Sequence, residues 1–318
     1  MSKIKNISII ILTYNSQQTL WPCLESITAL DYPKDFIEIL LLDNGSHDNT
    51  VQIIQQFGYE HISLPDFNLS ELRNYGADMS TGDIVSFIDS DCVVSADWLT
   101  QVVKWFDDPT VGIVGNEYLL PRDATIFERN WYNKSNYGIK YNELIPAGNM
   151  AVKKEYFCQL GGFDNNLLTG EDDYILRKFR SAGFKTISDH RIRSVHLGNP
   201  KNLWEYFKKE IWYGLGMLGT LHLSQWDKPL IATIAFFLSF LLGCVFLIFY
   251  FVTASSYLIV PIACAFVCSL ALPLLSALDR VYGKKRKGNP FFVMLIFIIF
   301  FMARVKSLFN IMCNNYRR

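Results

Sequence analysis

Two aspartates, separated by one residue, directly follow a short apolar run in the first third of the chain. Asp89 and Asp91 flank Ser90 and come after Ile84–Ile88, which has the composition of a buried strand. Carboxylates at the carboxyl end of such a strand lie at the sheet edge where ligands bind. Such oxygen ligands suit Mg²⁺ or Mn²⁺, which share their coordination sphere with substrate phosphates. The pair therefore predicts a divalent-metal site, although an isolated Asp-x-Asp is more often a solvated turn that caps a helix.

Other polar residues follow two further apolar runs. Thr13, Tyr14 and Asn15 end the first run, and Asp43 ends the second. If the runs are neighbouring parallel strands, these side chains gather at one edge of the sheet. Arg73 could steady a diphosphate there, since a guanidinium binds phosphate oxygens with charge-assisted hydrogen bonds. The alternative for Arg73 is an ordinary surface salt bridge.

Three consecutive carboxylates, Glu171, Asp172 and Asp173, open a predicted helix. They can simply favour the positive end of the helix dipole. The functional alternative is that one of them is a general base, because group transfer to a hydroxyl needs a carboxylate that accepts the proton. His196 could be a third metal ligand or an interfacial polar residue.

Strands and helices alternate in the segments that would position these residues. The apolar runs are Ile7–Leu12, Ile37–Leu42, Ile84–Ile88 and Gly112–Tyr118. The predicted helices are Gln17–Leu30, Asn68–Met79 and Ala96–Phe106. A further helix is predicted to be capped by Asp48 and to run to Phe57. This alternation predicts an α/β domain with a mostly parallel central sheet. Pro121–Glu143 lacks a clear pattern and suits a loop-rich insertion.

The composition divides the chain into two unlike parts. No charged residue or histidine occurs from Pro229 to Leu278, the tail from Asp279 onward has a net charge of +8, and residues 1–228 carry −8. These values exclude a purely soluble globular protein, a disordered chain and a nucleic-acid binder with a globally basic face. They predict a soluble front domain and a membrane-embedded back.

The back of the chain contains two predicted transmembrane helices, at about 230–252 and 257–278. Each exceeds the roughly 20 apolar residues that span a bilayer. The basic loop that follows is placed in the cytoplasm by the positive-inside rule, so two crossings place the front domain there too. A third apolar helix at about 291–312 could span, with its cations reaching the interface, or could lie in the membrane plane. The expected location is therefore the inner or plasma membrane, with several crossings and a cytoplasmic catalytic domain.

An aromatic amphipathic helix precedes the membrane part. Asn202–Leu223 is rich in Trp and Tyr, which favour the membrane interface. We therefore predict three regions: a catalytic domain over residues 1–200, an interfacial helix within 201–228 and a membrane domain over 229–318.

Seven short motifs, in order and at similar spacing, resemble family 2 glycosyltransferases. They are Ile7–Asn15, Asp43–Ser46, Arg73–Gly76, Gly82–Asp91, Gly148-Asn149, Gly161–Asp164 and Gly170–Asp172. The resemblance covers about residues 5–190. It implies a GT-A fold, a nucleoside-diphosphate sugar donor with a UDP-sugar favoured, Mn²⁺ or Mg²⁺, and inversion at the anomeric carbon. The tail resembles that of bacterial members that build cell-surface polysaccharides or lipid-linked sugars.

The resemblance also implies roles for single residues. Those expected to contact the donor are Thr13, Tyr14, Asn15, Asp43, Arg73, Asp89, Gly148 and Asn149. Asp89 and Asp91 form the metal and nucleotide motif, with His196 as a further candidate ligand. Asp172 matches the catalytic base, and Glu171 is the second catalytic candidate.

Departures from the family pattern narrow the expected activity. Tyr174 stands where the family often has a further acidic residue, which leaves the separate roles of Glu171 and Asp173 open. The Gln-x-x-Arg-Trp motif of processive synthases is missing, so transfer of one sugar is expected, to a lipid-linked or glycan acceptor and not to nucleic acid. Two alternatives are a nucleotidyltransferase, which would need a Gly-rich phosphate loop that Thr13–Ser16 does not provide, and a non-catalytic membrane partner.

Overall fold

The computed structural model describes residues 4–132, 138–167, 169–215, 228–283 and 288–313. Contacts within the chain divide it into two units. The first comprises Met1–Arg122 and Asn136–Asn199, and the second comprises Asp123–Ser135 and Pro200–Arg318. The boundary lies close to the predicted end of the catalytic domain, but the sequence did not predict that residues 123–135 belong with the membrane helices.

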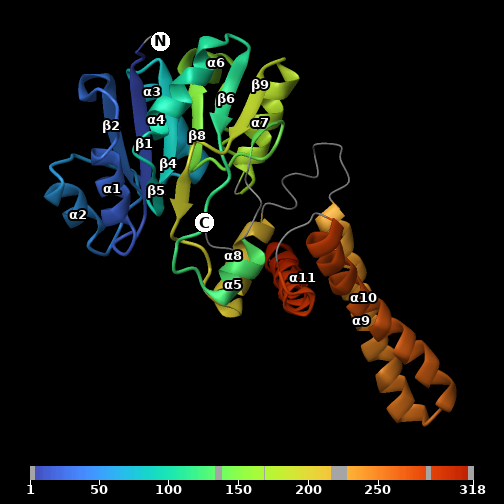
Figure 1. Cartoon of the computed structure of the whole chain (residues 1–318). Helices are drawn as coiled ribbons and strands as arrows, with labels where there is room; N and C mark the ends of the chain where they lie inside the picture. The colour runs from blue at the N-terminus through green and yellow to red at the C-terminus, as the bar shows by residue number, and fades with distance from the viewer. Residues whose placement is uncertain (1–3, 133–137, 168, 216–227, 284–287, 314–318) are drawn as a thin grey trace. The chain divides into compact units, whose positions relative to one another are not determined.

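An eight-stranded sheet forms the centre of the first unit (Figure 1). In spatial order its strands are β3 (Ile62–Ser63), β2 (Ile37–Asp43), β1 (Ile7–Thr13), β4 (Ile84–Asp89), β8 (Asn149–Lys153), β6 (Val111–Gly115), β9 (Lys185–Asp189) and β7 (Ile139–Tyr141). The pairs among β3, β2, β1 and β4 are parallel, as is β6 with β9, whereas β8 and β7 run antiparallel to their neighbours. The predicted α/β fold with a mostly parallel sheet is thus confirmed.

Two hydrophobic cores cover the two faces of this sheet. Along β1, Ile9 and Ile11 belong to one core and Ile10 and Leu12 to the other, as the alternation of a strand requires. The first core includes α1 (Leu20–Thr28), α2 (Thr50–Gln56) and α4 (Trp98–Val103). The second includes α3 (Leu69–Met79), α6 (Lys154–Gln159) and α7 (Glu171–Ser181). Because both faces are covered, the central strands are mostly apolar along their length.

The register of the strands brings the polar strand ends to one edge. Thr13 pairs with Asp43, and Leu12 pairs with Asp89. A separate antiparallel pair, β5 (Cys92–Val94) with β10 (Ser194–His196), places His196 opposite Cys92. Segments that are about 100 residues apart in the sequence therefore meet beside Asp91.

Helix boundaries differ from the prediction where local hydrogen bonds compete with helical spacing. The helix α1 begins at Leu20 instead of Gln17. The residue at the N-cap position of α2 is Asn49, one residue after the predicted Asp48, and the Asn49 side chain makes no capping hydrogen bond. Asp48 instead accepts hydrogen bonds from the backbone N–H groups of Gln17 (3.1 Å) and Thr50 (3.0 Å), and so connects the two helices.

The second unit contains the apolar helices. The helices α9 (Lys228–Thr253) and α10 (Ile259–Leu278) form an antiparallel hairpin (Figure 1), close to the two predicted spans. With α11 (Pro290–Met312), three helices are long and apolar enough to cross a membrane. The helix α8 (Leu203–Gly214) begins where the amphipathic helix was predicted to begin, whereas residues 216–227 lie outside the described residues.

A short inserted helix, α5 (Ile126–Trp131), is part of the second unit. A capping box between Thr125 and Glu128 begins it. The fully buried Glu128 pairs with Lys201 at 2.8 Å, and Phe127 shares a small core with Tyr206 and Ile296. The segment predicted as loop-rich therefore contains a helix, and its apolar partners are far away in the sequence.

Candidate active site

Thr13 and Asp43 form a rigid corner at the ends of β1 and β2. The Thr13 hydroxyl donates to Asp43 Oδ1 at 2.9 Å, and the backbone N–H groups of Gly45 and Ser46 donate to Oδ2 at 3.1 and 2.8 Å. Gly45 has a φ of +77°, and a Cβ there would lie 2.8 Å from Pro65. Asp43 is buried and shapes the turn.

Tyr14 and Asn15 complete this edge. Tyr14 is 60% exposed, so its ring is accessible to a ligand. Asn15 adopts a left-handed conformation with φ of 47°, and its backbone N–H donates to the Ser46 hydroxyl at 2.9 Å. Its side-chain oxygen accepts from the N–H of His47 at 2.9 Å. Asn15 thereby ties the two loops together.

Both carboxylate oxygens of Asp89 accept hydrogen bonds from the protein. Arg73 Nη2 lies 3.2 Å from Oδ1, and the Tyr118 hydroxyl donates to Oδ2 at 3.1 Å. Gly148 makes this arrangement possible, because a Cβ there would lie 2.1 Å from Asp89 Oδ2 and 2.4 Å from the Tyr118 hydroxyl. Asp89 is therefore oriented by its neighbours.

Asp91 lies beside His196, as one of the two alternatives for this histidine requires. His196 Nε2 is 3.3 Å from Asp91 Oδ2, and the N–H of Leu197 donates to the Asp91 carbonyl at 2.8 Å. A Cβ on Gly198 would lie 1.9 Å from Asp91 Oδ2, so only glycine allows the chain to pass so closely. The His196 ring also packs on Tyr118, with ring centroids 4.6 Å apart.

The donor atoms at this position fit a hard divalent cation. Ligand atoms of Asp91, Cys92 and His196 all lie within 4.8 Å of one another. Burial, followed by the charges of Asp91 and Asp89, raises the pKa of the Cys92 thiol well above its usual value, and a thiol is a softer ligand than the oxygens that Mn²⁺ and Mg²⁺ prefer. The carboxylate and imidazole that remain suit Mn²⁺ or Mg²⁺.

Arg73 connects the metal motif to the acidic cluster. Its side chain is buried, and Nη1 pairs with Glu171 Oε1 at 2.7 Å while Nη2 pairs with Asp89. The guanidinium thus lies between two carboxylates of the chain. This position differs from the surface salt bridge considered for it, and it joins β4 to the start of α7.

Asp172 has the titration behaviour of a base that works near neutral pH. Burial, and next the charge of Glu171, raise the pKa of Asp172 to about 7, against the opposing effect of the Asp173 backbone N–H. That N–H donates to Asp172 Oδ1 at 2.8 Å. Asp173 pairs instead with Arg177 at 2.6 Å, one turn further along α7. The three adjacent carboxylates therefore lie in different environments.

Asn149 does not offer its side chain to a ligand. It is fully buried, and Oδ1 accepts from Trp98 Nε1 at 2.9 Å. Its amide nitrogen donates to the carbonyls of Asn116 at 2.9 Å and Ile192 at 3.3 Å. The prediction that the Asn149 side chain contacts the donor is therefore wrong, because its hydrogen bonds are made within the core, where they hold β8.

The sequence did not single out Tyr118 as a site residue. It lies three residues after β6 and contacts both Asp89 and His196. The signal available was its place just beyond a strand's carboxyl end, the criterion that found Asp43 and Asp89.

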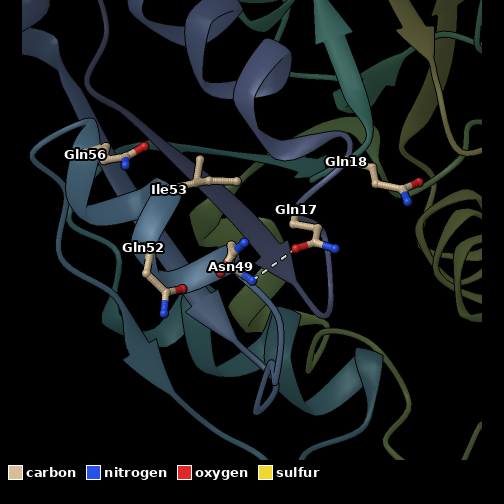
Figure 2. A pocket seen from close by; sticks show the side chains of 6 residues that line it. All are labelled: Gln17, Gln18, Asn49, Gln52, Ile53 and Gln56. Carbon is tan, nitrogen blue, oxygen red and sulfur yellow. Dashed lines mark hydrogen bonds between the residues drawn. The ribbon is translucent and has the colours of Figure 1, made fainter.

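A pocket lined mainly by amide side chains lies between the start of α1 and α2. Figure 2 shows that its lining residues are Gln17, Gln18, Asn49, Gln52, Ile53 and Gln56. The backbone N–H of Asn49 donates to Gln17 Oε1 at 3.3 Å. The lining includes none of the candidate catalytic or metal-binding residues, so this pocket is not the candidate active site.

Comparison with known proteins identifies the class to which this fold and site belong. Residues 8–153 match glycosyl transferase family 2, and residues 84–303 match glycosyl transferase family group 2. The chain therefore belongs to the family 2 glycosyltransferases, and it is a glycosyltransferase. The expectation of this family from the seven motifs is confirmed.

Individual relatives agree with this assignment. Glycosyltransferase AglE of Haloferax volcanii is 29% identical over 67% of this chain and 73% of its own length. Glucosyl-dolichyl phosphate glucuronosyltransferase of the same organism is 22% identical over 65% of this chain and 72% of its own. The mannosyltransferase PcManGT from Pyrobaculum calidifontis, solved with GDP-Man and Mn²⁺, has a TM-score of 0.63 at 20% identity, covering 97% of this chain and 88% of its own. These likenesses support the GT-A fold.

Proposed function

We propose that this chain is an inverting, metal-dependent glycosyltransferase that moves one sugar from a nucleoside-diphosphate sugar to a hydroxyl of a lipid-linked or cell-surface glycan. The observation that carries the proposal is the sheet edge itself. It presents a carboxylate–imidazole pair that suits a divalent cation, and a carboxylate, Asp172, whose pKa is raised to about 7.

Asp91 and His196 are the proposed metal ligands. When bound, a divalent cation neutralises charge on the leaving diphosphate. Asp89 orients the site through Arg73 and Tyr118, since both of its oxygens are already engaged. The PcManGT structure contains Mn²⁺, which supports a divalent ion here.

The corner at β1 and β2 is the proposed nucleotide pocket. Tyr14 offers an exposed ring against which a base can stack, and Thr13 and Asn15 hold the loop that carries it. The sequence favoured a UDP-sugar, whereas PcManGT was solved with GDP-Man. The nucleotide is therefore the first variable to test.

Asp172 is the proposed general base. Near pH 7 it can take the proton of an acceptor hydroxyl while that oxygen attacks the anomeric carbon opposite the diphosphate, and this direction of attack inverts the carbon. Glu171 pairs with Arg73, and its charge raises the pKa of Asp172, so it acts through Asp172.

A membrane-associated acceptor follows from the apolar helices. Three helices could cross a membrane, and by the positive-inside rule the basic segment after α10 supports a catalytic unit on the cytoplasmic side. The name of one relative specifies a glucosyl-dolichyl phosphate, which supports a lipid-linked acceptor.

The experiment is a donor screen on the full chain in detergent. UDP-, GDP- and dTDP-sugars are supplied with Mn²⁺, and hydrolysis and transfer to a lipid-phosphate sugar are measured. We expect one nucleotide class to be used, with the product anomer inverted by NMR. Asp172→Asn should lower the rate of transfer by about 10²–10⁴ but keep donor binding, while its matched control Asp173→Asn stays active. Full turnover by Asp172→Asn, or a retained anomer, would refute the mechanism.

A further inference from the structure

The helices α8 and α11 run side by side as a fixed pair. Arg304 Nη2 of α11 lies 2.6 Å from Glu210 Oε2 of α8, and the Ser307 hydroxyl donates to the Ile211 carbonyl at 2.9 Å. A Cβ on Gly214 would lie 2.5 Å from Ser307, so this glycine allows the two backbones to approach. Glu210 and Gly214 of α8 contact Arg304 and Ser307 of α11, in the same order along both helices, so the two helices run parallel.

The composition of α8 places it at the membrane surface. Its twelve residues include Glu205, Lys208, Lys209 and Glu210, which are costly within hydrocarbon. Trp204, Lys208 and Trp212 are exposed and follow one another at intervals of four, so they form one stripe on the helix. Tryptophan and lysine on one helical stripe are typical of a helix that lies in the interface.

The aromatic contacts of α11 with α9 fit a crossing of these two helices. Phe301 stacks on Phe236 with ring centroids 5.2 Å apart, and Phe309 contacts Phe237 at 5.6 Å. Adjacent residues of α9 are about 1.5 Å apart along the axis, whereas eight residues of α11 cover about 12 Å. If α11 spanned alongside α9, two contacts separated by eight residues on α11 would also be separated by about eight residues on α9.

Burial along α9 agrees with a crossing near one end. Leu230, Thr233 and Phe236 are buried, whereas Phe251 and Val252 are more than three-quarters exposed. The far half of the hairpin is thus left for lipid. In addition, the apolar run of α11 before Arg304, Phe291–Ala303, is shorter than the roughly 20 residues of a span.

The exposed residues among those of α11 whose side chains are described form one narrow stripe. They are Phe291, Leu295, Met302, Lys306 and Phe309, which recur at intervals of three, four and seven residues. Four of the five are apolar, which suits contact with acyl chains, and Lys306 suits contact with anionic headgroups.

We infer that α11 lies in the membrane interface together with α8, so that the chain crosses the bilayer twice and the end of α11 is on the same side as the start of α9. The partner of the exposed stripes on α8 and α11 is the lipid surface. This inference rests on the membrane location in the proposed function, and it selects one of the two orientations that the sequence left open for the third helix.

The native thiol of Cys313, exposed just after α11, tests the inference without altering the helix. In a chain carrying Cys158→Ser, Cys264→Ala and Cys268→Ala, a membrane-impermeant maleimide is applied to sealed vesicles of each orientation. Two reference chains also carry Cys313→Ser and either Tyr282→Cys, near the end of α10, or Tyr257→Cys, at the hairpin turn. Tyr282 and Tyr257 are 65% and 90% exposed.

We expect Cys313 to be labelled in the same vesicle orientation as the Tyr282→Cys reference. Labelling together with the Tyr257→Cys reference would show that α11 spans and would overturn the inference. If the two references are labelled from the same side, the hairpin does not cross, and the membrane location fails together with the inference. The first failure leaves the proposed transferase chemistry intact, so the two are distinguishable.

Discussion

The pH dependence of sugar transfer tests the assignment of the base directly. The pKa of Asp172 is about 7, raised by burial and next by the charge of Glu171. A general base acts in its deprotonated form, so the rate should fall as the pH drops through this value. Glu171→Gln removes the neighbouring charge, and the acidic limb of the rate profile should therefore move to lower pH.

The size of this movement can be worked out from the charges. Two carboxylates ~7 Å apart repel by about 2 kcal/mol at an effective dielectric constant of about 20, and one pKa unit corresponds to about 1.4 kcal/mol. Arg73 lies 2.7 Å from Glu171 and neutralises part of its charge. We therefore expect the acidic limb to shift by about one pH unit.

The assay is the initial rate at saturating donor from about pH 5 to 9. Asp173→Asn is the matched control, because the charge of Asp173 is the weakest of the named causes acting on Asp172 and its removal should shift the limb less. Asp172→Asn should lower the rate by about 10²–10⁴ and remove the limb. An acidic limb that persists in Asp172→Asn, or does not move in Glu171→Gln, would refute the reasoning.

The same pKa can be measured without turnover. A carboxyl whose folded-state pKa lies above its unfolded value binds its proton more tightly when folded, so its contribution to stability declines as the pH rises from about 4 to about 7. Asp172→Asn should therefore raise the Tm above pH 7 and change it little near pH 4. Equal changes at both pH values would contradict the raised pKa.

Three further substitutions test the remaining geometry. Tyr118→Phe keeps the ring on His196 but removes the hydrogen bond to Asp89, so kcat should fall about tenfold, as expected for about 1.4 kcal/mol, with Mn²⁺ affinity nearly unchanged by calorimetry. His196→Ala should weaken Mn²⁺ binding at least tenfold, and unchanged affinity would remove it from the ligand set. Gly148→Ala places a Cβ 2.1 Å from Asp89 Oδ2, so activity should be lost and the Tm should fall, whereas a fully active variant would show that the loop can shift.

The polar residues at the edge of the sheet could be predicted because each of them directly follows an apolar strand in the sequence. Each apolar strand of the parallel half is followed at once by its polar residue, as in Thr13, Asp43 and Asp89, and parallel pairing then aligns these ends. The helix α3 was similarly predictable, since the capping box between Asn68 and Glu71 lies within four residues.

The contacts that the sequence did not predict join residues that are distant in the sequence. Arg73 meets Glu171 across 98 residues, and Asn149 meets Trp98 across 51, so nothing near either residue indicates an ion pair or a core amide. The contact of Tyr118 with Asp89 requires the antiparallel strand β8 to bring Gly148 between β4 and β6. Such contacts follow from topology, which a single sequence does not display.

The helix α5 is translated long before the residues on which it packs. Its partners Lys201 and Asn289 emerge from the ribosome 73 and 159 residues after the α5 residues that they contact. Until then its apolar side has no core to join, although the strands on either side of it are already made. The inserted helix is therefore still without these partners when the last strand of the sheet has been translated. A fragment that ends at Asn199 would carry residues 123–135 without the rest of the unit to which they belong.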